Sequence, residues 1–203
     1  MQFVLATTNE HKVREISQIL AAVGLELELV PRPAHLPDVE ESGTTFEENA
    51  RLKAVAVCAA TGLPSIADDS GLVVDALGGA PGVRSARYAG THEPDDERNL
   101  DKLIAAMEAF GDGERTARYV AVAIARFPDG REVAAFGEVA GVLTRERRDG
   151  GEGFGYDPVF VPDDGDGRTF AQMPAAAKHE ISHRGRAFRT LADGLRIMDA
   201  TGG

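Results

Sequence analysis

A polar segment at residues 6–12 joins a short apolar run at residues 3–6 to a stretch whose apolar residues recur at helical spacing. The first N–H groups of a helix are unpaired and the helix dipole is positive there, so anions bind at such an end. Thr8, Asn9 and Lys12 add donors that suit a phosphate, although the segment lacks the G-x-x-x-x-G-K-[ST] pattern of a Walker loop. The segment is therefore either a phosphate-binding loop or a simple helix cap.

Two pairs of adjacent acids offer carboxylates for metal or proton chemistry. Asp68 and Asp69 end an apolar run and precede a Ser-Gly pair, and Glu40 and Glu41 precede another. One carboxylate from each pair would suit a Mg²⁺ ion that keeps several waters and bridges substrate phosphates. A carboxylate there could also accept a proton from water. The alternatives are an ordinary Asp-Ser-Gly turn and a solvated pair of glutamates.

The segment Gly-Gly-Glu-Gly-Phe-Gly-Tyr-Asp-Pro at residues 150–158 frames two aromatic rings with four glycines. Such a loop lets the backbone approach a ligand, and a planar base stacked on Phe154 or Tyr156 would gain about 1–3 kcal/mol. Asp157 could pair with the donor edge of that base. The alternative is a loop whose two aromatic rings fold back onto the core instead of being exposed.

Near the end of the chain, Ser182 is expected to cap a helix whose first turn holds His183 and Arg184. Cations at a helix N-terminus oppose the dipole, which favours an anion between them. His179 and His183 have the HxxxH spacing of a zinc pair, but no third ligand or HExxH glutamate accompanies them. We therefore reject a zinc site.

The elements expected to position these residues follow from periodicity and caps. A capping box at Thr44 or Thr45 with Glu47 or Glu48 starts one helix, and Pro128-Asp129-Gly130 marks a hairpin. The β-loop-α-β opening indicates an α/β fold, and no repeat or long linker divides residues 1–203, so one domain with two lobes is expected. The expected strands are residues 3–6, 25–30, 65–68, 71–77, 118–127, 131–142 and 159–161, with a turn between 68 and 71, and the expected helices are residues 13–23, 44–61, 99–110, 174–181 and 184–200.

Composition excludes several classes of protein. The formal net charge of −11 argues against nucleic-acid polymers and anionic membranes, which need an extended basic surface, but not against a small polyanion. The single cysteine, Cys58, excludes an intrachain disulfide and fits a reducing cytosol. No apolar run approaches the roughly 18 residues that span a bilayer, and the first residues do not resemble a signal peptide.

Taken together, the motifs resemble the inosine/xanthosine triphosphate pyrophosphatases, also called non-canonical purine NTP pyrophosphatases or the Ham1-like family. The resemblance covers nearly the whole chain and occurs in family order. The segments that carry it are ATTNEHK at residues 6–12, SGTTFEENARLKA at 42–54, IADDSGLVVDALGGAPGVRSARYAG at 66–90, GEGFGYDP at 151–158 and SHRGRA at 182–187.

The resemblance implies a cytosolic, homodimeric, Mg²⁺-dependent enzyme. It would cleave dITP, ITP, XTP and dXTP between the α- and β-phosphates, on a long mixed sheet flanked by helices with two lobes around a substrate cleft. The implied triphosphate-binding residues are Thr7, Thr8, Asn9, Glu10, His11, Lys12 and Lys53, with Asn49 beside them. Asp69 is the implied catalytic acceptor and metal ligand, Glu40 or the adjacent Glu41 is the second metal carboxylate, and the other implied substrate contacts are Ser70, Phe154, Gly155, Tyr156, Asp157, Lys178, His183 and Arg184.

One departure from the family pattern concerns Lys178. The family commonly has an acidic residue just before this lysine, whereas this chain has three alanines there, so Lys178 is expected to lack a local partner. Two rival functions also stay open: a pyrophosphatase for modified pyrimidine triphosphates, and a nucleotide-binding regulator without turnover.

Overall fold

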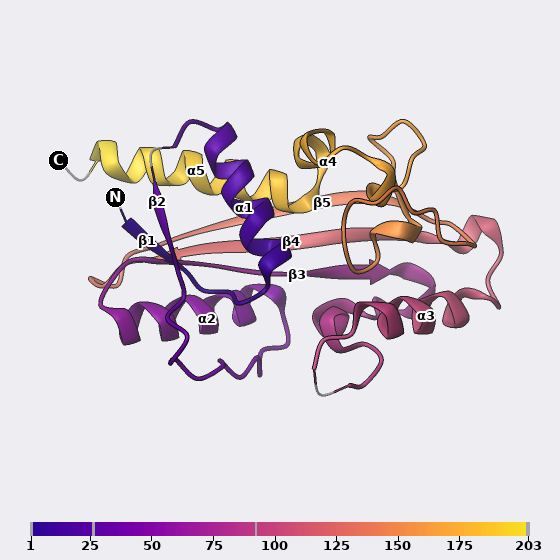
Figure 1. Cartoon of the computed structure of the whole chain (residues 1–203), viewed down its shortest axis with the longest axis horizontal. Helices are drawn as coiled ribbons and strands as arrows, with labels where there is room; N and C mark the ends of the chain where they lie inside the picture. Colours follow the sequence, from indigo (N-terminus) through magenta and orange to yellow (C-terminus); the bar gives the residue numbers. More distant parts are fainter. Residues whose placement is uncertain (1, 26, 92, 202–203) are drawn as a thin grey trace. The chain divides into compact units, whose positions relative to one another are not determined.

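The computed structural model describes residues 2–25, 27–91 and 93–201. Six strands form one sheet in the order β2-β1-β3-β4-β5-β6 (Figure 1). β1 is parallel to β2 and β3, whereas β5 and β6 are antiparallel, so the sheet is mixed. This confirms the predicted α/β fold. The strands are β1 Gln2–Leu5, β2 Glu28–Pro31, β3 Ser65–Val74, β4 Thr116–Arg126, β5 Glu132–Leu143 and β6 Phe160–Pro162, and the helices are α1 Glu10–Ala22, α2 Phe46–Thr61, α3 Asp96–Met107, α4 Ala175–Ile181 and α5 His183–Thr201.

The chain divides into two compact units, and β3, β4, β5 and α5 each contribute residues to both. The first unit comprises the chain up to Asp69, Ala121–Gly137 and the chain from Arg184 on, and the second comprises Ser70–Val120 and Glu138–His183. That residues 1–203 act as one domain stays a prediction. Within the described residues, none of the helices combines the length and apolar character needed to cross a membrane.

In the first unit, successive side chains of β1 enter two different apolar clusters, as strand periodicity requires. Phe3 and Leu5 pack with residues of α1 and α5, whereas Val4 and Ala6 pack with residues of α2. Helices α1 and α5 accordingly lie on one side of the strands and α2 on the other (Figure 1). The loop at residues 6–12, helix α2 and the part of β3 up to Asp69 all belong to this unit.

Side-chain caps account for where α1, α2 and α3 begin, whereas α4 begins after Pro174 without one. Asn9 caps α1 by accepting the backbone N–H of Lys12, and Thr45 and Glu48 form a reciprocal capping box at α2. Asp95 caps α3 by accepting the N–H of Arg98, so this helix starts earlier than the predicted residue 99. The strand expected at residues 25–30 is β2, which begins later, and residue 26 lies outside the described residues.

The second unit has its own apolar core, to which the end of β3, the start of β4 and the end of β5 contribute. Leu72 and Val74 of β3 pack with Leu100 and Leu103 of α3, and a group of aromatic rings from β4, β6 and the following loop completes the cluster. Helix α4 and the first residue of α5 belong to this unit.

One predicted turn is wrong. The expected break between residues 68 and 71 does not exist, because β3 runs without interruption from Ser65 to Val74. Gly71 permits close packing rather than a turn: a Cβ atom there would lie 2.4 Å from the Ser85 hydroxyl oxygen. That hydroxyl accepts the N–H of Leu72 at 2.9 Å. Asp68 and Asp69 are therefore neighbours inside a strand and point to opposite faces of it.

Candidate active site

The loop at residues 7–12 is organised by its own side chains. The N–H of Asn9 donates to the hydroxyl of Thr7 at 3.2 Å, and the side chain of Asn9 accepts the N–H of Lys12 at 3.1 Å. The capping interpretation therefore holds for Asn9. Thr8, Glu10 and His11 are exposed at the start of α1, which leaves this helix end open to a ligand.

Lys12 belongs to a buried network of opposite charges in the first unit. Its ammonium lies 3.0 Å from Oδ2 of Asp68, and the guanidinium of Arg184 lies 3.4 Å from the same oxygen. Arg184 also pairs with Glu15 of α1. Burial would raise the pKa of Asp68, but Lys12, Arg184 and Lys53 outweigh it and hold this pKa well below its usual range. Asp68 is therefore ionised, and it binds Lys12 from near the start of the chain and Arg184 from near its end.

This network accounts for the cations in the first turn of α5. Arg184 pairs with two carboxylates of the same chain. Asp68 therefore supplies part of the negative charge that the sequence predicted at this end of the helix. Only 2% of the residue Arg184 is exposed. The site residue predicted to contact substrate is thus engaged with Asp68 and Glu15.

Lys53 contacts one carboxylate from each of the two acidic pairs that the sequence suggested for a metal site. Its ammonium lies 2.8 Å from Oδ1 of Asp69 and 2.7 Å from Oε1 of Glu41. Burial would lower the pKa of Lys53, but Asp69, Asp68 and Glu41 outweigh burial and raise it. Burial also raises the pKa of Asp69, with Lys53 acting against it. Lys53 thus remains charged beside a carboxylate with increased basicity, which suits Asp69 to accept a proton.

Glu41, rather than Glu40, converges on Asp69 in the structure. The side chain of Glu41 is 28% exposed and reaches Lys53, whereas the contact that Glu40 makes among the described residues is a backbone one, in which its carbonyl accepts the N–H of Ser42. A carboxylate oxygen of Glu41 and one of Asp69 both contact the nitrogen of Lys53. Carboxylate oxygens are the type of ligand that Mg²⁺ prefers. Among the described residues no three His, Cys, Asp or Glu form a metal cluster. Two carboxylates nevertheless fit Mg²⁺, because this ion keeps waters and takes further oxygens from substrate phosphates.

Helix α2 supplies both Lys53 and Asn49, which lie one turn apart. The side-chain oxygen of Asn49 accepts the N–H of Gly43 at 2.8 Å, and only 2% of Asn49 is exposed. Asn49 therefore holds the loop after Glu41, and its part in phosphate binding stays a prediction. Ser70 follows Asp69 in β3 and is partly buried.

In the second unit, Asp157 is the centre of a buried hydrogen-bond network. Its Oδ2 accepts the ammonium of Lys178 at 2.7 Å and the N–H of Phe154 at 2.9 Å, and its Oδ1 accepts the hydroxyl of Tyr119 at 3.2 Å. The sequence predicted no local partner for Lys178, and the structure pairs this lysine with Asp157. Its partner is not local but 21 residues away in the sequence. Gly153 makes this possible, since it has a φ of +79° and a Cβ atom there would lie 2.4 Å from Oδ2 of Asp157.

The two aromatic rings of the 150–158 loop have different environments. Only 4% of Tyr156 is exposed and its hydroxyl donates to the carbonyl of Ser85, so for Tyr156 the alternative of a ring folded back onto the core holds. Phe154 is half-buried, with the ammonium of Lys178 5.3 Å from its ring centre. The N–H of Gly155 donates to Asp96 of α3 at 3.1 Å. Phe154 is therefore the ring of this loop that a base could reach.

His183 is placed by an aromatic neighbour that the sequence did not indicate. The rings of His183 and Tyr119 are stacked, with centres 4.5 Å apart and planes within 7° of parallel. Tyr119, Glu15 and the anchoring role of Asp68 were all missed. No local signal points from Glu15 to Arg184, which lies 169 residues away in the sequence, and Tyr119 stands in an apolar strand pattern that predicts only a core residue.

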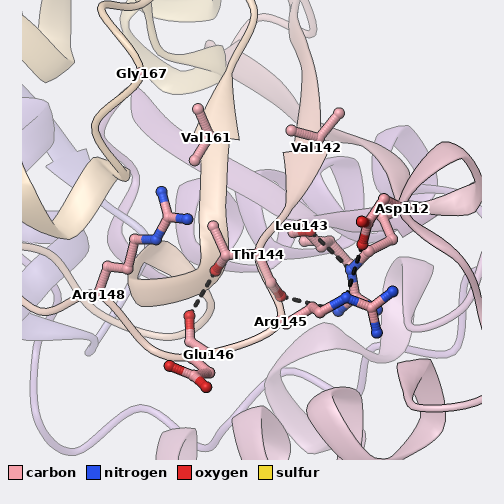
Figure 2. A pocket seen from close by; sticks show the side chains of 10 residues that line it. Asp112, Val142, Leu143, Thr144, Arg145, Glu146, Arg148, Val161 and Gly167 are labelled. Carbon is pink, nitrogen blue, oxygen red and sulfur yellow. Dashed lines mark hydrogen bonds and ion pairs between the residues drawn. The ribbon is translucent and has the colours of Figure 1, made fainter.

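A separate hollow of about 510 Å³ lies in the second unit, around the ends of β5 and β6 (Figure 2). Within the described part of the chain, its wall contains none of the predicted site residues. Arg115 in this wall donates to the backbone carbonyls of three residues, and Arg145 pairs with Asp112 at 2.7 Å. These arginines therefore serve the local structure of the loops.

Comparisons with known proteins agree with this arrangement. The family model described as the Ham1 family matches residues 3–194. A dITP/XTP pyrophosphatase of Streptomyces coelicolor is 49% identical over 199 residues, covering 97% of this chain and 98% of that protein. A solved HAM1 protein from Coxiella burnetii has a TM-score of 0.85 and 38% identity, covering 97% of this chain and 98% of that one. A solved nucleoside-triphosphatase, dITP/XTP pyrophosphatase, from Mycobacterium abscessus has a TM-score of 0.74 and 40% identity, covering 94% and 97% of the two chains. Because the matched residues include every segment of the candidate site, the chain belongs to the Ham1 family.

Proposed function

We propose that this protein hydrolyses non-canonical purine nucleoside triphosphates, dITP, ITP, XTP and dXTP, to the monophosphate and pyrophosphate, and so cleanses the nucleotide pool. The structural observation that carries the proposal is the ammonium of Lys53 between the carboxylates of Asp69 and Glu41. Relatives that match almost end to end are named dITP/XTP pyrophosphatases, which supports the same substrate class.

The residues of the first unit suit the phosphate chemistry. Phosphoryl transfer mainly needs positioning and neutralisation of charge, and Lys12, Lys53 and the open end of α1 provide both. A water oxygen forms the new bond to phosphorus, the α–β anhydride bond breaks, and pyrophosphate leaves with the bonding electrons. Asp69 takes the proton of that water, for which its raised pKa suits it.

We infer that Glu41 and Asp69 hold one Mg²⁺ per subunit, in place of the Glu40 and Asp69 pair suggested by the motif. When bound, Mg²⁺ would neutralise charge that develops on the phosphate oxygens. Lys53 keeps the two carboxylates together until the ion binds.

The residues of the second unit suit recognition of the base. The ring of Phe154 offers a stacking surface, and Lys178 and His183 offer donors for the 6-oxo group of hypoxanthine and xanthine. Adenine has a 6-amino donor at this position, and leaving a buried donor unpaired is costly. The interactions of Lys178 and Asp157 indicate that Asp157 positions the lysine.

The test of this function is a substrate panel. Purified protein with Mg²⁺ is given dITP, XTP, dATP, dGTP and dUTP, and pyrophosphate release is followed for each, with Asp69→Asn as the inactive control. We expect kcat/KM for dITP and XTP to exceed those for the other nucleotides. Equal turnover of dATP would disprove the substrate class, preference for a pyrimidine would support the first rival, and binding without release would support a regulator.

Three further features belong to the same proposal. We infer a homodimer, which sedimentation equilibrium would detect as twice the chain mass. The cytosol is the expected location, in agreement with a buried, unpaired Cys58 and with the place of nucleotide metabolism. Residues 1–203 are expected to act as a single domain, which predicts one cooperative transition in urea.

A further inference from the structure

Tyr119 of β4 contacts two of the residues that are assigned to the base, although no motif includes it. Its ring stacks on the imidazole of His183 at 4.5 Å, and its hydroxyl donates to Oδ1 of Asp157 at 3.2 Å. Only 7% of Tyr119 is exposed. Tyr119 is therefore largely covered by its neighbours, and two of these are residues assigned to the base.

The ring of Tyr119 is itself held by other aromatic rings. Phe160 packs edge-on against it with centres 4.9 Å apart, and Phe170 lies 5.9 Å away with its plane tilted by 33°. Both phenylalanines are fully buried. Aromatic contacts of this kind stabilise a packed ring beyond the burial of its area. Tyr119 is thus a rigid part of the core with two polar neighbours.

Each neighbour gains a fixed orientation from this ring. The imidazole of His183, at the start of α5, lies flat against a ring that also packs against Phe160 and Phe170. The carboxylate of Asp157 is fixed by three donors, and Tyr119 supplies the one that meets Oδ1. Because Oδ2 accepts the Lys178 ammonium, rotation of this carboxylate would also move the lysine.

We propose that Tyr119 is a positioning residue that sets the selectivity for the purine base, by orienting His183 and the Asp157–Lys178 pair together. The proposal rests on the function proposed above. It assigns two separable tasks to one side chain: the ring orients His183, and the hydroxyl orients Asp157.

Two variants separate these tasks. Tyr119→Phe keeps the stacked ring and removes the hydroxyl, so KM for dITP should rise about three- to tenfold, as for one lost hydrogen bond, while kcat changes less than about twofold. The ratio of kcat/KM for dITP to that for dATP should fall. Tyr119→Leu removes both contacts and should lower this ratio further. Tyr88→Phe is the control, because no hydrogen bond of the Tyr88 hydroxyl is recorded among the described residues, and it should leave both constants unchanged.

A double-mutant cycle tests whether the hydroxyl acts through Asp157. If it does, Tyr119→Phe should raise KM much less in an Asp157→Asn background than in the wild type. Equal effects in the two backgrounds would overturn this part of the proposal. A fall in kcat with unchanged KM and unchanged selectivity in Tyr119→Phe would overturn the positioning role as a whole.

A spectroscopic readout is independent of the substrate assignment. The ring current of Tyr119 should shift the Cε1–H proton resonance of His183 upfield, a shift that Tyr119→Phe keeps and Tyr119→Leu loses. An unshifted resonance in the wild type would overturn the stack. If the wild type does not prefer dITP, the proposed function is wrong. The role of Tyr119 is then still tested by the His183 resonance and by the coupling to Asp157, measured with whichever nucleotide binds.

Discussion

The ammonium of Lys178 lies 2.7 Å from Oδ2 of Asp157, and the two side chains are only 4% and 3% exposed. Removing one partner of such a pair leaves an uncompensated buried charge, which costs about 3–5 kcal/mol. We expect Lys178→Met to lower the free energy of unfolding by this amount, and Lys178→Met with Asp157→Asn to restore part of it. Urea titration measures both. A double variant as unstable as the sum of the single variants would show that the pair is not coupled.

Glu41 and Glu40 provide a matched pair for testing the metal site. Glu41→Gln should raise the Mg²⁺ concentration that gives half-maximal activity at least about tenfold, because a neutral amide is a weaker ligand than a carboxylate. Glu40→Gln should leave this concentration within about twofold, since exposed charges contribute little. Activity is measured across a Mg²⁺ titration. A larger effect of Glu40→Gln than of Glu41→Gln would show that Glu40, and not Glu41, is the metal ligand.

Asp69 is expected to act in the chemical step. Asp69→Asn keeps the shape of the side chain and an oxygen for Lys53, but it cannot accept a proton, so kcat should fall about 10²–10⁴-fold. Circular dichroism and the unfolding midpoint should stay close to those of the wild type. An unchanged kcat in a folded variant would remove Asp69 from the reaction.

Asp68 is expected to stabilise the fold in a pH-dependent way. The pKa of its carboxyl lies below the unfolded value of 3.8, so its contribution is present above pH 3.8 and is lost as the pH falls through the folded pKa. Asp68→Asn should lower the free energy of unfolding at pH 7 by about 3–5 kcal/mol. The difference from wild type should shrink at lower pH. Asp193→Asn, at an exposed ion pair on α5, is the control and should have little effect at any pH.

The capping box at α2 is expected to stabilise the helix that presents Lys53. Thr45→Ala removes the oxygen that accepts the N–H of Glu48, and this should cost about 1 kcal/mol of stability. Thr190→Ala, at an exposed position inside α5, removes no cap and should leave stability equal or slightly higher. Similar losses in the two variants would show that the cap contributes nothing specific.

Local sequence signals predicted much of this molecule. The strand at the apolar run of residues 3–6, the cap at Asn9 and the box at Thr45 and Glu48 were readable because each depends on residues within one turn or one strand. The motif at residues 66–90 indicated the family and, with it, the carboxylate that we propose to be catalytic, Asp69. The same local reasoning failed at residues 68–71, where the Asp-Ser-Gly pattern suits a turn but close packing against Ser85 favours a continuous strand.

The partners of the charged side chains were decided only by the tertiary structure. Lys12 meets Asp68 across 56 positions of sequence, Arg184 meets the same carboxylate across 116, and Tyr119 meets Asp157 across 38. Hydrophobic period and caps act over a few residues, whereas these contacts depend on which strands are neighbours and which faces pack. The sequence by itself therefore determined the chemical groups and the elements that carry them, and only the fold decided which carboxylate holds which cation.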